Sequence, residues 1–154
     1  MRPVTFLRIA SVLTLIHAVL HTAGGVFGAP ATGEQQAVVE TMKAHVFPVM
    51  GVMRSYWDFR MGMGLAVSVF LTAEAVVFWQ LGSLTKTDAL RLRPVLTTFL
   101  VGYAALAFVS YRYFFVAPVI TELLIAGCLG MAIASCRQSL ALEPSALPGR
   151  GVAG

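Results

Sequence analysis

Ionisable side chains placed inside long apolar stretches are the residues of this sequence that could do chemistry. They are His17, His21, Glu74, Arg112 and Glu122, with Asp58 at the start of a further stretch. In lipid an ionisable residue is costly, so it is a functional candidate by default. Carboxyl and imidazole groups exchange protons, and the positively charged guanidinium group binds a negatively charged group. The set therefore suits general acid–base catalysis.

The composition explains why so few charges stand out. Of 154 residues, 58% are hydrophobic and 12% are charged, and the mean hydropathy is +0.81. Such a chain has too little polar surface for an ordinary soluble domain, a disordered chain or a secreted disulfide scaffold. It is typical of an integral membrane protein. The net charge of +4 comes without a dense run of lysine and arginine, so we expect no nucleic-acid partner.

Four apolar blocks of about 20 residues are each long enough to cross the hydrocarbon core as a helix. We therefore predict an all-α integral membrane four-helix bundle over residues 1–137, followed by a flexible tail over 138–154. The expected spans are 8–28, 57–81, 95–115 and 117–136. The first block also resembles a signal peptide, with small residues at 28–31, but its two histidines favour a retained helix.

The first loop is the long one. Thr32 and Gln35 predict a capping box for a short amphipathic helix over about 34–45, and Ser55 with Asp58 predicts a second box at the next span. With the N-terminus inside, seven lysine and arginine residues lie on the cytoplasmic side and four on the other. This bias predicts cytoplasmic N- and C-termini, with the short helix in an extracytoplasmic loop.

On this topology Asp58, His21, Arg112 and Glu122 share the outer third of the bundle. We interpret Asp58 or Glu122 as the acid and base, His21 as the proton partner and Arg112 as the holder of charge. Aromatic, histidine and glycine residues at a similar depth would bind substrate: Tyr56, Trp57, His17, Tyr111 and Gly24. The expected reaction is isomerisation, cyclisation or epoxide opening of a lipophilic molecule such as an isoprenoid or sterol-like compound.

Structural roles compete with this interpretation. Asp58 could serve only its capping box, Arg112 and Glu122 could pair across a turn, and the histidines could join neighbouring helices. The spacing of His17 and His21 also suits two ligands of one metal ion, with Asp58, Glu122 or His45 to complete the set. We expect no metal and no cofactor. Small residues such as Gly24 would allow helices to pack closely.

Three segments carry a resemblance to known proteins: Met53-Arg54-Ser55-Tyr56-Trp57-Asp58-Phe59, His17-x-x-x-His21-x-x-Gly24-Gly25 and Tyr111-Arg112-Tyr113-Phe114-Phe115-x-Ala117-Pro118. Together they resemble a family of short bacterial four-span membrane proteins. The resemblance implies four spans and a bacterial inner membrane, and it implies no particular reaction. The architecture is more loosely similar to emopamil-binding-type isomerases and DoxX-like proteins.

Other functions stay open at this point. The chain could be a non-enzymatic ligand-binding protein or an accessory subunit of a membrane complex. It could also be a small transporter or proton-conducting protein that uses Glu74. The expected partners are a membrane lipid or lipophilic small molecule, and either further copies of the chain or another membrane protein.

Overall fold

The protein, seen in a computed structural model, is described over residues 2–28 and 32–141. Four helices are long and apolar enough to cross a membrane: Pro3–Val26, Tyr56–Asp88, Arg93–Tyr113 and Val116–Cys136. The predicted all-α class with four membrane-spanning helices is therefore confirmed, and the chain is an integral membrane protein. Residues 29–31, within the small-residue stretch, and most of the expected tail, 142–154, lie outside the described residues.

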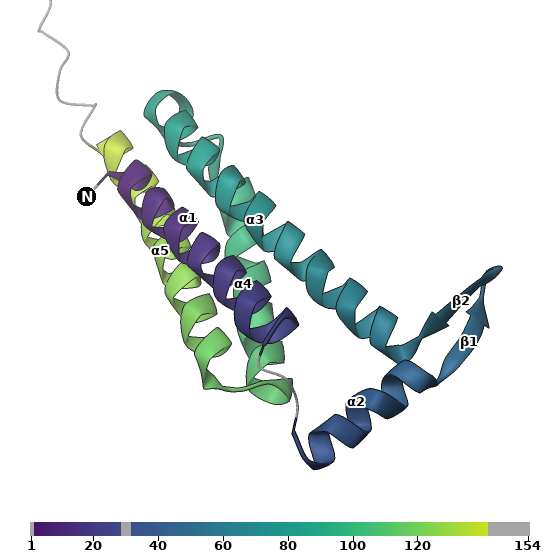
Figure 1. Ribbon diagram of the computed structural model, residues 1–154. Helices are drawn as coiled ribbons and strands as arrows, with labels where there is room; N and C mark the ends of the chain where they lie inside the picture. Colours follow the sequence, from purple (N-terminus) through teal and green to yellow (C-terminus); the bar gives the residue numbers. More distant parts are fainter. Residues whose placement is uncertain (1, 29–31, 142–154) are drawn as a thin grey trace, which may run out of the picture. The chain divides into compact units, whose positions relative to one another are not determined.

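The elements follow one another along the chain as shown in Figure 1. They are α1 (Pro3–Leu20), the π-helix η1 (His21–Val26), α2 (Glu34–Ala44), β1 (Val46–Val49), β2 (Val52–Ser55), α3 (Tyr56–Asp88), α4 (Arg93–Tyr113) and α5 (Val116–Ala141). With 33 residues, α3 is about 50 Å long and exceeds the hydrocarbon thickness.

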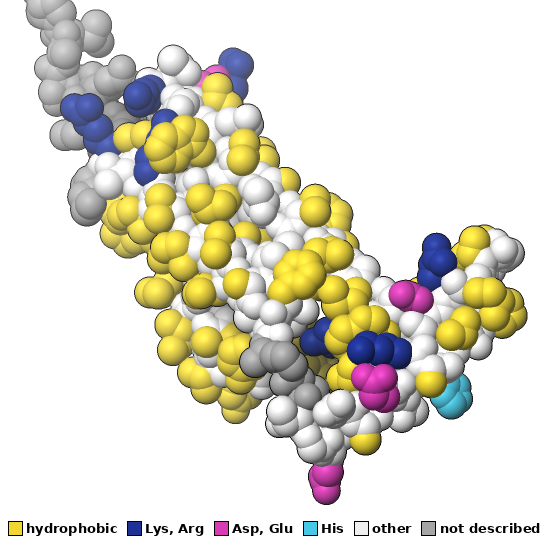
Figure 2. All heavy atoms as spheres, viewed as in Figure 1, with side chains coloured by type: hydrophobic (Ala, Val, Ile, Leu, Met, Phe, Trp, Pro, Cys, Tyr) yellow, Lys and Arg dark blue, Asp and Glu magenta, His cyan; other side chains and the backbone are white. Residues whose placement is uncertain are grey.

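Lipid-facing surface covers the long helices. Large apolar side chains such as Phe70 on α3, Phe108 on α4 and Leu124 on α5 are exposed. Figure 2 shows the same on one face, where hydrophobic and uncharged atoms cover the helices and charged side chains gather near helix ends. A helix that is apolar on all sides suits a membrane rather than water.

Two compact units divide the chain: Thr14–Ala75 forms the second unit, and the described residues of Met1–Leu13 and Val76–Gly154 form the first. The core of the first unit is built around Phe78, whose ring meets Phe99 edge-on at 5.0 Å between centroids. Leu7, Leu96 and Ile125 are fully buried in the same cluster. In this unit α4 and α5 lie side by side (Figure 1), joined only by Phe114 and Phe115.

The second unit contains a β-hairpin that the sequence analysis did not predict. Strands β1 and β2 are antiparallel, with Val46 opposite Ser55 and Val49 opposite Val52. The two-residue turn between them has positive φ angles at both positions, 48° at Met50 and 88° at Gly51. These angles indicate a type I′ turn, which matches the twist of a tight hairpin.

The short helix before the hairpin is present, but its predicted capping box is wrong. The N-cap residue of α2 is Gly33, with a φ of 58°, and no side chain caps the helix. Because α2 begins at Glu34, Thr32 stands one residue too early to act as the cap. The backbone carbonyl of Gly33 accepts from Gln36 N–H instead.

Candidate functional site

The first membrane span ends in a π-helix, η1, which runs from His21 to Val26. Wider turns of this kind are rare and often occur at functional sites. The adjacent glycines Gly24 and Gly25 weaken an α-helix, so they lower the cost of the wider turn. The sequence analysis did not predict η1. The adjacent glycines are the feature of the sequence that could have indicated it.

His21 is held by the backbone of α3. Its Nε2 lies 3.1 Å from the carbonyl oxygen of Gly64. A carbonyl oxygen only accepts, so Nε2–H donates and Nδ1 is the ring nitrogen left for proton exchange. A Cβ at Gly25 would stand 3.5 Å from that Nδ1, which is an ordinary van der Waals distance.

Two hydroxyl groups continue this network. Thr22 Oγ1 lies 2.7 Å from the Ala18 carbonyl oxygen and 2.8 Å from Ser68 Oγ, which in turn lies 3.1 Å from the Gly64 carbonyl oxygen. Each hydroxyl has one proton, so two protons serve three contacts. Only two of the contacts can be hydrogen bonds at one time, and the hydroxyl protons can therefore adopt three arrangements.

His17 lies one turn before His21 on the same helix face. It is half-buried, and within the described part of the chain its Nδ1 is buried without a hydrogen-bond partner. The described residues contain no group of three His, Cys, Asp or Glu side chains placed to hold a metal ion. Among the described residues, this nitrogen therefore has no hydrogen bond that would give it a structural role.

An open groove of about 380 Å³ lies next to the histidines in sequence. It is apolar apart from two threonines, and its lining residues are Ala18, Val19, Thr22, Ala23, Phe27 and Thr72. Gly24 is close by in η1, and no atom lies within 4 Å of the position that a Cβ would take there. The groove can accommodate an apolar molecule with a small polar group.

Asp58 caps the start of α3, as its spacing from Ser55 predicted. Its Oδ2 accepts from Ser55 N–H at 2.8 Å and from Ser55 Oγ at 2.9 Å. Asp58 N–H lies 3.2 Å from the same hydroxyl oxygen and completes the capping box. This carboxylate oxygen therefore holds the helix end.

The expected aromatic residues at the start of α3 contact the loop before it. The Tyr56 ring centroid lies 4.9 Å from that of Phe47 and 6.4 Å from that of His45. Lys43 Nζ lies 5.3 Å, and Arg60 Cζ 4.9 Å, from the Trp57 ring centroid. Both are cation–π distances.

Glu122, in the first unit, is 2% exposed. Its Oε1 accepts from Ser110 Oγ at 2.8 Å, while Oε2 is buried and has no partner among the described residues. Arg112 is exposed and lies over its own neighbour Tyr113, with 5.3 Å from Cζ to the ring centroid. In the described part of the chain it forms no ion pair with Glu122, and Tyr111 is exposed.

The expected cluster of four residues therefore divides between the units. His21 and Asp58 belong to the second unit, and Arg112 and Glu122 belong to the first. No protein-family model, curated protein or solved structure matches the chain. A functional proposal must therefore rest on the residues and contacts of each unit.

Proposed function

We propose that the protein binds a lipophilic small molecule from the bilayer, of the isoprenoid or sterol-like class, and catalyses an acid–base reaction on it. The observation that carries this proposal is an open, mostly apolar groove built partly on a π-helix that begins at a histidine. Ligand sites are mostly apolar with a few placed polar groups, and this groove has that character.

The two histidines supply the chemistry of the proposal. Imidazole is the side chain best suited to proton exchange near neutral pH. His21 is fixed through Nε2, so it can exchange a proton only through Nδ1. In an isomerisation, one imidazolium would donate a proton to one carbon while the neutral imidazole accepts a proton from a second carbon. The total charge of the pair stays the same, and a proton then passes back from one ring to the other to restore the starting state.

Simple structural roles explain part of the site. A hydrogen bond between helices accounts for His21 without any catalysis. It does not account for the buried, unpartnered Nδ1 of His17. The same groove also supports a second function, in which the protein binds the lipophilic molecule without turnover or presents it to a partner subunit.

Native mass spectrometry of the gently extracted protein tests the proposal. Ala23→Trp places a large ring at the groove, and Val69→Trp places one at an exposed position of α3 that does not line it. We expect a bound lipophilic molecule to be lost from the Ala23→Trp protein and kept by the Val69→Trp protein. Equal occupancy in both proteins would reject the groove as the site.

Turnover of the identified molecule then separates enzyme from binding protein. His17→Gln and His21→Gln keep polar side chains but cannot exchange protons as imidazole does. For an enzyme, both variants should retain the ligand and lose product formation. If the unsubstituted protein forms no product, or if both variants keep full activity, the catalytic part of the proposal is wrong.

A further inference from the structure

The β1–β2 hairpin is apolar on both faces. Residues that pair directly across an antiparallel ladder lie on the same face. Phe47, Val49 and Val52 therefore share one face with Arg54, while Val46, Pro48 and Met53 share the other face with Ser55. A hairpin in water normally alternates apolar and polar residues so that one face is solvated. Between Val46 and Met53 this hairpin offers no polar side chain to water.

The turn of the hairpin is also apolar. Met50 at its tip is 102% exposed, and its φ of 48° lies in the left-handed region. Type I′ turns favour asparagine, aspartate and glycine at such positions, because other side chains are strained there. Met50 therefore has two unfavourable effects: it strains the backbone of the turn, and it exposes apolar surface to water. Contact with an apolar environment would offset their combined free-energy cost.

The direct connection of the hairpin to α3 indicates where the hairpin lies relative to the membrane. β2 ends at Ser55, and α3 begins at Tyr56 with no linker between them. Since α3 is a candidate span and its first charges are Asp58 and Arg60, we expect the base of the hairpin near the membrane surface. Figure 1 shows the hairpin extending sideways from this end of α3. A two-stranded ribbon has unpaired backbone groups along both edges, which excludes the hydrocarbon core but not the hydrated headgroup layer.

Cations and aromatic rings surround the base of the hairpin. Lys43 and Arg60 lie against Trp57, and Arg54 is exposed on β2. Aromatic rings favour the membrane interface, and lysine and arginine favour anionic lipid. Figure 2 shows hydrophobic side chains on the hairpin with dark blue cations beside them.

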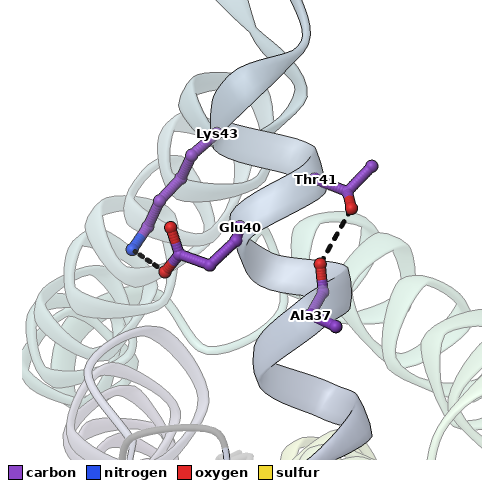
Figure 3. A network of polar contacts seen from close by, with 4 residues as sticks. All are labelled: Ala37, Glu40, Thr41 and Lys43. Atoms are coloured by element: carbon purple, nitrogen blue, oxygen red, sulfur yellow. Dashed lines mark hydrogen bonds and ion pairs between the residues drawn. The ribbon is translucent and has the colours of Figure 1, made fainter.

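Lys43 also forms an ion pair with Glu40 at 3.3 Å, drawn in Figure 3. Both side chains are about half exposed, so this pair is weak and leaves Lys43 able to contact a phosphate. The cations here are balanced in number by Glu34, Glu40 and Asp58. This end of α3 therefore offers lysine and arginine to lipid phosphates without an excess of positive charge.

We propose that the β1–β2 hairpin lies in the headgroup layer of the membrane that α3 spans, with Met50 toward the acyl chains. Lys43, Arg54 and Arg60 face the phosphates of the phospholipids. This role is independent of the groove and of any reaction there. It makes the hairpin a membrane-surface anchor that fixes the depth of α3.

An environment-sensitive nitrobenzoxadiazole label on a single introduced cysteine tests the depth of the hairpin. Met53→Cys places the label on exposed β2, and Ala37→Cys places it on α2, on the side away from Val39 and Met42. The full chain is reconstituted in phosphatidylcholine vesicles containing phosphatidylglycerol, with and without brominated acyl chains. The unsubstituted protein, labelled in parallel, measures any reaction of Cys128 and Cys136.

We expect the label at Met53→Cys to emit at shorter wavelength than the label at Ala37→Cys, and to be quenched by brominated lipid. Adding Met50→Asn to the Met53→Cys protein should reduce quenching although asparagine suits the turn better. Equal emission wavelengths at the two sites would overturn the proposal. So would a short-wavelength emission at Met53→Cys that occurs only together with energy transfer between labelled copies, because a second copy rather than lipid would then cover the hairpin.

Discussion

At the scale of single residues, the buried carboxyl of Glu122 depends on Ser110. Ser110 Oγ donates to Glu122 Oε1 at 2.8 Å, and Oε2 already lacks a partner in the described part of the chain. Ser110→Ala would leave both oxygens unpaired, and we expect a loss of about 1–3 kcal/mol in the free energy of unfolding. Glu122→Gln keeps an oxygen that accepts from Ser110, so it should cost less. Thermal melting in detergent measures both, and a neutral Ser110→Ala would contradict the assignment.

Asp58 gives a second prediction at this scale. Because its Oδ2 accepts two hydrogen bonds from Ser55, Asp58→Ala should lower the melting temperature by freeing the start of α3. Asp58→Asn retains an accepting oxygen and should melt closer to the unsubstituted protein. If Asp58→Asn abolished turnover without changing the melting temperature, the residue would be catalytic rather than only a cap.

At the scale of elements, η1 packs against α3 at Gly64. A Cβ there would lie 2.9 Å from Val26 Cγ2, and Val26 is buried and stiff because it is β-branched. We expect Gly64→Ala to destabilise the protein in thermal melts and to disturb the contact of His21 with the Gly64 carbonyl oxygen.

Gly62→Ala is the matched control, because no atom lies within 4 Å of its added Cβ. It should be neutral, or stabilising by up to about 1 kcal/mol, since alanine favours a helix more than glycine does. Val26→Ala in the Gly64→Ala background should recover stability by removing the clash. A Gly62→Ala protein that melts below the Gly64→Ala protein would contradict the packing argument.

The elements also show how far the sequence predicts this fold. Long apolar runs define the spans, and Ser55 with Asp58 specifies a local capping box, so these features are visible without structure. The hairpin is not visible in this way, because it departs from the usual hairpin pattern, and η1 has only the adjacent glycines Gly24 and Gly25 as a signal. The hairpin has Pro48 within a strand and Met50 where a turn favours asparagine.

The candidate site was harder to predict for a geometric reason. Depth along a span follows from the sequence, but the direction of a side chain around the helix and its backbone partner do not. His21 meets the Gly64 carbonyl oxygen, which no residue type signals, and Glu122 meets Ser110 rather than Arg112. A shared depth for four ionisable residues therefore predicts candidates, and contacts within each unit decide what each one can do.

At the scale of the whole molecule, the distribution of charge predicts orientation. The junction of α3 and α4 is basic: Lys86 is in the last turn of α3, Arg91 is in the connection and Arg93 begins α4. The segment before α3 is longer and less basic for its length. Lysine and arginine near span ends are retained in the cytoplasm. We therefore expect α2 and the hairpin outside and the connection from α3 to α4 inside.

Cysteine labelling in intact cells measures this orientation. Ala37→Cys lies on exposed α2 and Thr87→Cys lies at the exposed far end of α3, so one membrane span separates the two positions. A membrane-impermeant maleimide should label Ala37→Cys in intact cells and Thr87→Cys only after the membrane is opened. The unsubstituted protein corrects for Cys128 and Cys136. The reverse pattern would place the hairpin in the cytoplasmic leaflet, and labelling of both sites in intact cells would mean that α3 does not cross the membrane.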